Sequence, residues 1–522
     1  VASAAAAAPA EEPGGADAAE ALKLGAFAGG GGMQRFRHVF GTETPGRRPT
    51  YNFSPLLTNL DEPGVACSDH FWAVPCAGGG GPVFVSPMES HGKVEVGRPM
   101  INGHKSSVTS IAFGRFDPAL MATGADDGSL ALWQLPEGGP TAAMGADDAV
   151  ALVSGNDAPV RHVEWHPGAA DLLMCTASDN TVRLFDVNSS GGGGGGSGGA
   201  AAVVLRCHPQ AIHCAAFSGD GALIATTCHD GLLRVLDPRT GDAVSQVAAH
   251  EGSRAQRVAW WFGARAPPLE LLVTTGGGRQ AQRQLGLWDP RRMTMPLSMT
   301  NVDYSNGLLF PLLAEATGIL FLAGRGDTGI RFFELEVLSG PLDMRLAYCS
   351  DHKCGAEPMW GVALLPQTPG SLDVAGVEVA RMLRLTASAA EPLSFFLPRS
   401  NNLKPFFQDD IYSDVCGPTL AGSAADWLGG APCHPVKASL RPAGMPLVSE
   451  RPAQEHLVPQ SRKFRGEMEK REQDAKARAD ELARLSALAN QTAAFHPNLS
   501  MGVRRGVDQA PVLDDNEADW SD

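Results

Sequence analysis

This sequence of 522 residues lacks features that would place it in several other classes of protein. It has no apolar run of about 18 residues or more, which excludes a transmembrane helix. It also lacks a basic excess, because 57 Asp and Glu residues outnumber 42 Lys and Arg residues and give a net charge of −15. The whole protein is therefore not suited to attract nucleic acid. Finally, none of its ten cysteines forms a Cys-x-x-Cys pair, and their scatter predicts reduced thiols in the cytosol.

What the sequence does contain is a repeated unit, in a chain with 61 Gly and 38 Pro residues. The clearest copy, Ile101–Pro136, starts with a Gly-His pair and contains three short stretches that read as strands. A tight Asp-Asp-Gly turn precedes the third stretch. The Gly-His start, an Asp six residues before a Trp and a length near 40 residues predict one blade of a WD-repeat propeller.

The same frame recurs along the chain. A turn Asp stands six residues before a large apolar residue in Asp179–Phe185, Asp230–Leu236 and Asp327–Phe333, and a copy with a stretched turn ends at Trp288-Asp289. The intervals between these ends suit one four-stranded blade each. In such repeats a His, a strand Ser or Thr, a turn Asp and a Trp hydrogen-bond within the blade, each bond contributing about 1 kcal/mol. We therefore assign these residues to blade structure and not to catalysis: His104, Asp127, Trp133, Asp179, His208, Asp230, His250, Trp288 and Asp327.

Several strings, most of them outside this frame, resemble the coronins, the actin-binding WD-repeat proteins. They are FRHVFG at Phe36–Gly41, the glycine-rich Gly78–Val85, Ser305–Pro311, GRGDTGIRFFE at Gly324–Glu334 and FQDDIY at Phe407–Tyr412. The resemblance spans about residues 33 to 430 and implies seven blades, whereas the Asp frame shows five. We expect the sixth in Met359–Leu397, and the seventh from strands near 69–88 joined by a late strand.

The expected fold is all-β, a seven-bladed propeller with a C-terminal extension, one short helix and disordered ends. The predicted segments are a disordered Ala/Gly-rich stretch (1–32), the propeller (33–398), an extension that packs on it as a structural clasp or as a partner-binding strip (399–430), a Pro-rich linker (431–462), a helix with weak coiled-coil character (463–491) and a disordered acidic tail (492–522). Whether the helix mediates self-association stays open, because its heptad core includes arginines.

The resemblance implies a cytoplasmic protein that binds filamentous actin and regulates the turnover of branched filaments at the cytoskeleton. Filament surfaces are acidic, so the binding patch should be basic despite the negative net charge. The candidate bases form two clusters, Arg35, Arg37, Arg47 and Arg48 near the start and Arg279 and Arg283 near the fourth closing residue. Coronins usually carry an Arg shortly after the tyrosine that Tyr51 matches, and here residues 52–57 contain no base.

The acidic end, VLDDNEADWSD, is similar to the tails of factors that bind the actin-related-protein nucleating complex. Its candidate contacts are Asp514, Asp515, Glu517, Asp519 and Trp520, because a lone Trp among acids suits a partner's pocket. A solvated tail without a partner is the other reading.

The alternative function is a propeller scaffold for trafficking or signalling that does not bind actin. We expect no enzymatic activity, no cofactor and no metal, because the Asp and His residues belong to the blade frame and no nucleophile motif is present. Two clusters that resemble metal ligands, Cys349–Cys354 with His352 and Cys207–Cys214, lack the paired cysteines of a zinc site.

Overall fold

A computed structural model describes the chain in two units, Val1–Arg451 and Pro452–Asp522. In the first unit it describes residues 34–451 apart from 58–60, 154–157, 189–200, 253, 263–269, 281 and 341–342. In the second it describes residues 476–478, 480–481 and 483–485, which are helical. The predicted segment 1–32, most of the predicted helix 463–491 and the acidic tail lie outside the described residues. No helix among the described residues is long and apolar enough to cross a membrane.

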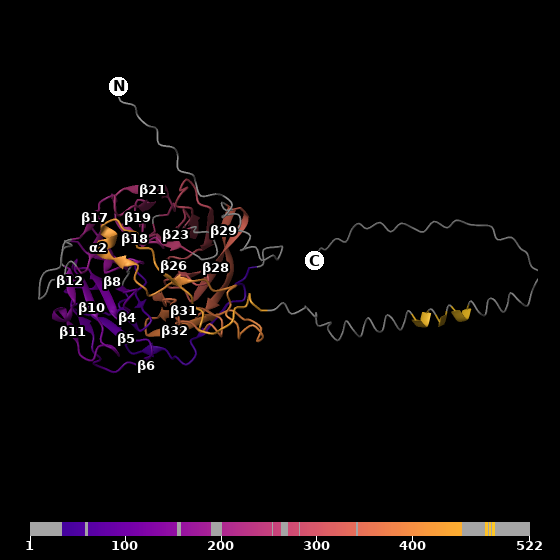
Figure 1. The fold of residues 1–522 in the computed structure, drawn as a ribbon. Helices are drawn as coiled ribbons and strands as arrows, with labels where there is room; N and C mark the ends of the chain where they lie inside the picture. The colour runs from indigo at the N-terminus through magenta and orange to yellow at the C-terminus, as the bar shows by residue number, and fades with distance from the viewer. Residues whose placement is uncertain are drawn as a thin grey trace, which may run out of the picture. The chain divides into compact units, whose positions relative to one another are not determined.

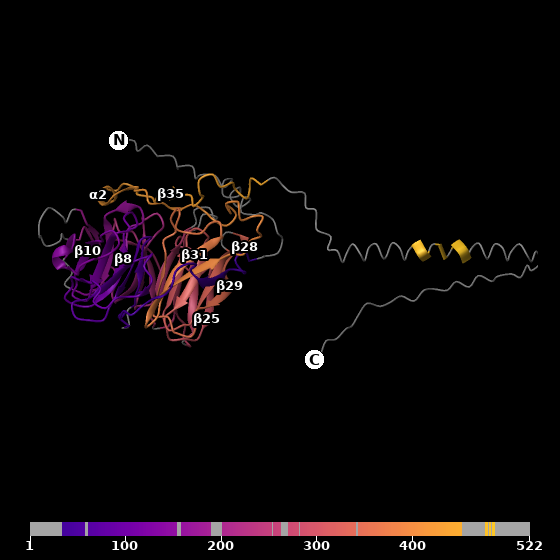
Figure 2. The same ribbon diagram turned by 90° about the horizontal axis from the view of Figure 1, so that it is seen from below.

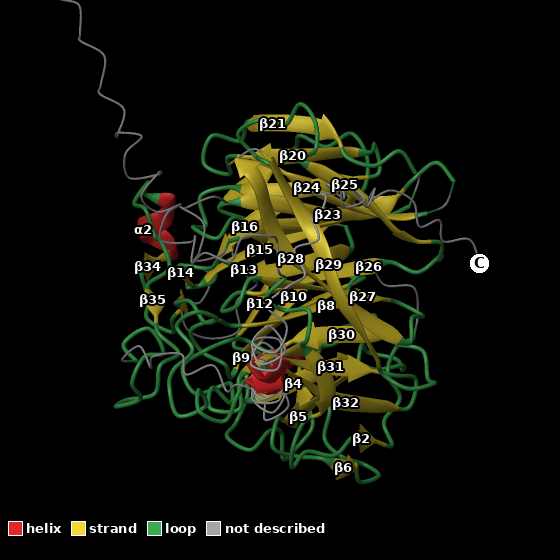
Figure 3. Cartoon of the chain, turned by 90° about the vertical axis from the view of Figure 1, so that its right-hand side faces the viewer, coloured by secondary structure: helices red, strands yellow, loops and turns green. Residues whose placement is uncertain are grey.

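Seven sheets of four to six strands form the blades of the first unit, and two further two-stranded sheets involve its C-terminal part. Strands make up nearly all of its regular structure (Figures 1 and 3). The prediction of an all-β seven-bladed propeller is confirmed. In chain order, blade 1 contains β3 (Ala66–Cys67), β4 (Phe71–Pro75), β5 (Val83–Pro87), β7 (Ile101–Asn102) and β11 (Met144–Gly145); blade 2 contains β8 (Val108–Phe113), β9 (Leu120–Ala125), β10 (Leu130–Gln134) and β12 (Ala151–Val153); and blade 3 contains β13 (Val160–Trp165), β15 (Leu172–Ala177), β16 (Val182–Asp186) and β17 (Val203–Leu205).

Blade 4 contains β18 (Ile212–Phe217), β19 (Ile224–Cys228), β20 (Leu232–Leu236) and β21 (Ala243–Ala248); blade 5 contains β22 (Arg257–Trp261), β23 (Leu271–Gly277), β24 (Arg283–Trp288) and β25 (Ser298–Asp303); and blade 6 contains β26 (Leu309–Ala314), β27 (Ile319–Gly324), β28 (Gly329–Gly340) and β29 (Asp343–Lys353). Blade 7 combines late and early strands, namely β30 (Gly361–Leu364), β31 (Glu378–Leu385), β32 (Ala389–Phe396), β1 (Phe40–Glu43), β2 (Thr50–Tyr51) and β6 (Gly92–Lys93).

The core of the unit lies between blades. Strand β27 is buried along its whole length, as are β4, β15 and β19. A strand in the middle of a blade is covered on both faces by neighbouring blades, so its sequence is almost continuously apolar and does not alternate. Apolar clusters that combine strands of adjacent blades follow from this, such as the one joining Phe321 and Phe332 of blade 6 to Phe395 of blade 7.

The ring is closed by the beginning of the described chain. Strand β1 pairs antiparallel with β32, from Phe40 opposite Phe396 to Glu43 opposite Leu393, and β2 pairs with the other end of β32. The expectation that strands near 69–88 would join a late strand is wrong, because β4 and β5 belong to blade 1 and pair within it. The FRHVFG string instead leads into the closing strand, which begins at its Phe40, and its Phe36 is fully buried against blades 6 and 7.

The C-terminal part of the unit crosses one face of the propeller (Figure 2). Its β34 (Gly422–Ser423) pairs with β14 (Ala169–Ala170) in the third-blade region, and its helix α2 (Ala424–Leu428) buries Trp427 against blades 3 and 4. Near blades 6 and 7, the Tyr412 hydroxyl donates a hydrogen bond to the Glu378 carbonyl.

Residues 431–451, expected to begin a linker, also belong to this packed segment. Strand β35 (Lys437–Ala438) pairs with β33 (Val415–Cys416), and Leu440 is buried in the cluster shared by blades 6 and 7. The prolines gave this stretch the composition of a linker, but apolar residues between them dock on the propeller. We call residues 399–451 the strap.

Truncation of Phe36 should open the closing contact. We expect Phe36→Ala to lower the free energy of unfolding by about 3–5 kcal/mol, because the side chain is fully buried and its removal leaves a cavity. Phe40→Ala is the matched control, since that ring is 50% exposed, and it should cost less than about 1 kcal/mol. Denaturant unfolding of the full chain measures both, and equal losses would show that Phe36 does not anchor the closure.

Candidate functional site

The predicted blade residues of the Ile101–Pro136 repeat lie within hydrogen-bonding reach of one another. The Trp133 indole donates to the Thr123 hydroxyl at 2.9 Å, and the same hydroxyl lies 2.7 Å from His104 Nε2. The other ring nitrogen of His104 lies 2.7 Å from Ser129 Oγ, whose hydroxyl donates to the Asp127 carboxylate. The pKa of His104 is lowered by burial, so this histidine is a neutral structural member of a closed chain of hydrogen bonds.

Two further blades use part of this arrangement. In blade 5 the Trp288 indole donates to Thr274 Oγ1 at 2.8 Å, and His250 Nε2 lies 2.9 Å from the same oxygen. In blade 4 His208 Nε2 lies 2.9 Å from Thr226 Oγ1, and Leu236 occupies the position of the Trp. Burial lowers the pKa of both His208 and His250 to about 4. These groups are tied inside blades and are unsuited to proton transfer near neutral pH.

The remaining turn aspartates bind arginines. Asp179 pairs with Arg183, and Asp230 pairs with Arg234 at 2.6 Å, in each case four residues further along the chain. Asp327 lies 3.6 Å from Arg331, again four residues further along the chain, and 2.7 Å from Arg283 of the preceding blade. The sequence carried a signal for this pattern, since each of the three repeats has an Arg two residues before its closing apolar residue.

Arg283 was a candidate for a basic binding surface, and the structure places it elsewhere. Its side chain is only 3% exposed and is held between Asp303 and Asp327. A guanidinium with two carboxylate partners in the interior cannot reach a partner protein without breaking both ion pairs. Arg283 therefore links blades 5 and 6 and is withdrawn from the candidate surface.

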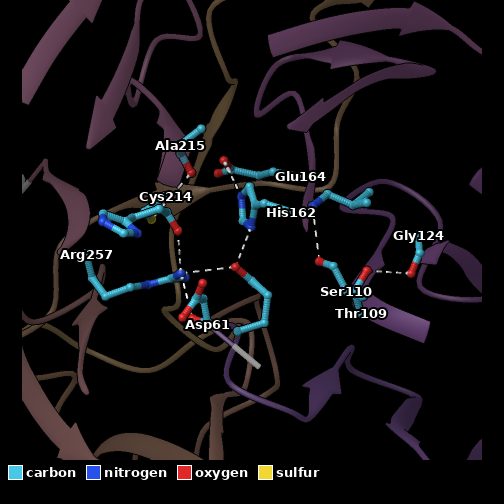
Figure 4. A network of polar contacts seen from close by, with 12 residues as sticks. Asp61, Thr109, Ser110, Gly124, His162, Glu164, Cys214, Ala215 and Arg257 are labelled. Atoms are coloured by element: carbon cyan, nitrogen blue, oxygen red, sulfur yellow. Dashed lines mark hydrogen bonds and ion pairs between the residues drawn. The ribbon is translucent and has the colours of Figure 1, made fainter. Parts of the chain in front are cut away.

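A charged network that sequence reasoning missed fills one part of the ring interior (Figure 4). Glu62, on the loop that leads into blade 1, accepts a hydrogen bond from Arg257 of blade 5 at 3.1 Å, and its carboxylate lies 3.0 Å from His162 Nδ1 of blade 3. Arg257 also donates to the carbonyls of Asp61 and His213. Arg325 of blade 6 donates to the Glu62 carbonyl at 2.6 Å. The loop is thereby tied to blades 3, 5 and 6.

The electrostatics of this network favour its charged form. Burial alone would raise the pKa of Glu62, but the charges of His162 and Arg257 outweigh it and hold the pKa at about 2. Burial alone would lower the pKa of His162, yet the Glu62 carboxylate raises it well above its usual value. Carboxylate, imidazolium and guanidinium therefore coexist as ions, which suits a structural tie and leaves no group poised to exchange a proton at neutral pH.

The exposed bases of the N-terminal part gather where the ring closes. Strand β2 pairs in parallel with β6, so that Tyr51 stands opposite Lys93. Tyr51 is 48% exposed, and Lys93 and Arg48 are exposed as well. Neither Arg48 nor Lys93 forms an ion pair with any of the described residues of the unit. We call Arg48, Tyr51 and Lys93 the closing rim.

The other candidate bases are partly committed to neighbours. Arg47 pairs with Glu89 at 2.7 Å, although its Nη1 has no hydrogen-bond partner among the described residues. It lines a cavity of about 340 Å³ together with His352 and Lys353. Arg279 is exposed and pairs with Glu251 at 2.5 Å, far along the chain from the closing rim.

The first two candidates, Arg35 and Arg37, flank the buried Phe36. Both are exposed, and Arg35 Nη1 lies 3.5 Å from the Asp410 carbonyl of the strap. The tail candidates Asp514, Asp515, Glu517, Asp519 and Trp520 lie outside the described residues. In the part of the chain that the structure describes, no three His, Cys, Asp or Glu side chains are placed to share a metal ion.

Comparison with known proteins decides the family. Human Coronin-2A is 31% identical over 446 residues, which cover 84% of this chain and 80% of the human protein. The chain belongs to the coronin family. Bovine Coronin-2A is 31% identical over 418 residues, covering 79% of this chain and 75% of the bovine protein. The crystal structure of the WD40 domain from Toxoplasma gondii coronin, 24% identical, shares the fold with a TM-score of 0.69 and covers 78% of this coronin and 98% of that domain.

Family models mark the same regions of this coronin. The matches are a WD domain, G-beta repeat, at residues 97–134, 149–186 and 200–237; a type of WD40 repeat at 390–432; and a domain of unknown function (DUF1899) at 34–93. The last match begins at the closing segment and ends at Lys93. The closing strands and the closing rim thus lie in one recognised segment.

The network around Glu62 gives a test by pH. The pKa of Glu62 is depressed from its usual value near 4.5. The stability that its carboxylate contributes is therefore present above pH 4.5 and is lost as pH falls toward about 2. The pKa of His162 is raised, so its contribution is present below about 6.5 and is lost as pH rises through its folded value. The network therefore stabilises this coronin most between about pH 4.5 and 6.5.

We expect Glu62→Gln to lower the free energy of unfolding by about 3 kcal/mol at pH 6, because Arg257 then keeps a buried charge without its carboxylate. The gap from the wild type should narrow as pH falls from about 4.5 toward about 2, because wild-type Glu62 takes up a proton first in the unfolded state and then in the folded state. Glu164→Gln, which changes the more exposed neighbour of His162, should cost less. Thermal melting across pH measures all three proteins, and a gap that is constant with pH would contradict the assignment.

Proposed function

We propose that this coronin binds filamentous actin through the closing rim, in the cytoplasm and at the cytoskeleton. The observation that carries the proposal is the pairing of Tyr51 with Lys93 beside the exposed Arg48. An exposed tyrosine opposite a lysine, with an exposed arginine three residues earlier in the chain, is the composition expected of an anchor for an acidic protein surface, because Tyr and Arg contribute strongly to binding and Lys adds charge.

The parallel pairing also bears on the base that coronins usually carry after the tyrosine. Residues 52–57 contain none, but the neighbouring strand presents Lys93 at the level of Tyr51. In this proposal Lys93 replaces the missing base from across the strand pair. Residues far apart in the chain then supply one binding surface.

The recess beside the rim supports the same interpretation. Arg47 has one guanidinium nitrogen without a partner among the described residues, and Lys353 lines the same cavity of about 340 Å³. A carboxylate from the filament would satisfy the unpaired donor of Arg47. Glu43 and Glu391 also line the cavity, and Glu391 is already paired with Arg384. The recess therefore suits an acidic side chain next to a contact on the rim.

Reversing the charges of the rim tests the site. We expect Arg48→Asp with Lys93→Asp to weaken pelleting of the full chain with filamentous actin by about tenfold or more, because like charges would then face each other. Binding of the wild type should weaken with added salt, since exposed charges are screened over about 8 Å at physiological ionic strength.

Arg206→Asp provides the control, because Arg206 is exposed on the loop after blade 3 and carries the same charge. It should leave pelleting nearly unchanged. Equal losses of actin binding in the two proteins would show that the effect comes from net charge alone, and would contradict the closing rim as the binding site. If the wild type does not pellet at low salt, the scaffold function that needs no actin takes the place of this proposal.

We further propose that the acidic end acts on branched-network turnover by binding the actin-related-protein nucleating complex. Trp520 with Asp514, Asp515, Glu517 and Asp519 forms an aromatic anchor surrounded by negative charge, which suits a basic pocket on a partner. The proposal rests on the sequence of this segment, and it leaves the closing rim free for the filament.

Removing the acidic end tests whether it binds the nucleating complex and not filamentous actin. A chain ending at Ala510 and the variant Trp520→Ala should both lose at least about tenfold in affinity for the purified nucleating complex, because each removes the aromatic anchor. Both should pellet with filamentous actin as the wild type does. Unchanged capture of the complex by both proteins would exclude the tail as its binding site.

A further inference from the structure

The closing rim continues into a tight turn after β6. Residues 95–98 form this turn, in which the Arg98 amide donates to the Glu95 carbonyl at 3.3 Å. Gly97 has a φ of 82°, a conformation that residues other than glycine rarely adopt. A Cβ added at Gly97 would meet no atom within 4 Å, so the backbone conformation, and not a lack of space, calls for glycine. The local sequence thus fixes the shape of this turn.

The turn is held to the rim on one side and to blade 1 on the other. The Val94 amide donates to the Tyr51 carbonyl at 2.9 Å, and the Asn52 side-chain amide donates to the Val94 carbonyl at 2.7 Å. Asn52 has a φ of 74°, which Asn tolerates better than most residues. After the turn, the Arg98 guanidinium lies over the Phe84 ring, 5.7 Å from its centroid. The turn therefore has a fixed place beside β2 and β6, which lie next to each other in Figure 3.

Val96 occupies the apex of the turn. It is 94% exposed, a larger fraction than any other large apolar residue has in the described part of the chain. Single apolar side chains are normal on protein surfaces, so exposure by itself assigns no role. What distinguishes Val96 is its place: it follows Lys93 by three residues, which puts the two Cα atoms within about 11 Å of each other. A partner that docks on the closing rim would thus meet this side chain as well.

We propose that Val96 is an apolar anchor of the filament-binding surface, which enters an apolar depression of filamentous actin next to the acidic groups that the closing rim contacts. This inference rests on the proposed function of the rim. Protein interfaces combine a dry apolar centre with polar groups around it, and the rim residues alone supply only the polar part. A β-branched side chain on a fixed turn also loses little conformational entropy when it is buried, which favours binding.

The charges of the turn itself give no attraction to an acidic surface. Glu95 is exposed and negative, and it offsets the positive charge of Arg98. The contribution of the turn to binding therefore comes from the burial of Val96. Salt in the physiological range does not screen apolar burial, whereas it does screen the attraction that Arg48 and Lys93 exert. This difference in salt dependence separates the anchor from the rim.

A change of one methyl group to a hydroxyl tests the anchor. Val96→Thr keeps the branched shape of the side chain, and it should weaken pelleting of the full chain with filamentous actin about fivefold, because the hydroxyl loses its water on contact. The loss should be the same at low and at physiological salt. Val96→Ile keeps the apolar surface and should bind at least as tightly as the wild type. Val150→Thr is the matched control, since Val150 is 61% exposed beside β12 of blade 2, and it should leave pelleting unchanged.

The rim variant Arg48→Asp with Lys93→Asp, measured beside it, should show a loss that shrinks as salt rises. If the wild type pellets and Val96→Thr pellets equally well, or if its loss shrinks with salt as that of the rim variant does, the anchor is overturned while the rim stands. A wild type that does not pellet at low salt would overturn the proposed function and the anchor with it. Because Val96 is exposed in the free protein, thermal melting of Val96→Thr should coincide with that of the wild type.

Discussion

The pairing of β1 with β32 is the contact on which the rest of this structure depends. A propeller blade has its apolar faces covered only by its two neighbours, so every core in the ring relies on the ring being closed. Closure here joins residues separated by most of the unit, and Phe36 anchors it from the buried side. The strap adds a second connection, because it contacts blades 6 and 7 at one end and blades 3 and 4 at the other.

Ion pairs inside the ring also join blades to one another, as the closing strands do. Glu62 brings the loop after the closing strands into contact with His162 and Arg257, and Arg283 joins two blades through Asp303 and Asp327. Buried ion pairs give little net stability compared with apolar packing, but the loss of one partner is costly. Such pairs therefore penalise arrangements in which blades shift relative to one another.

The proposed binding surface is a product of the closure. Tyr51 belongs to β2, which completes the edge of blade 7, and Lys93 approaches it only because β6 pairs alongside. The His, Asp and Trp residues of the repeats are occupied by hydrogen bonds and ion pairs within and between blades, as in the chain from Trp133 to Asp127. The proposed binding residues accordingly lie on the rim, in keeping with the general rule that function resides in sites added to a fold.

The sequence by itself determined the repeat frame, the all-β class and the family strings, because turn residues and strand patterns act over a few neighbouring positions. It also contained the Asp-to-Arg spacing of blades 3, 4 and 6. Only the tertiary structure decided which strand closes the ring, that Arg283 is buried, that Glu62 meets residues of blades 3, 5 and 6, and that Lys93 lies beside Tyr51. Each of these depends on contacts between residues tens to hundreds of positions apart, and local patterns carry no record of which distant segments come together when the ring closes.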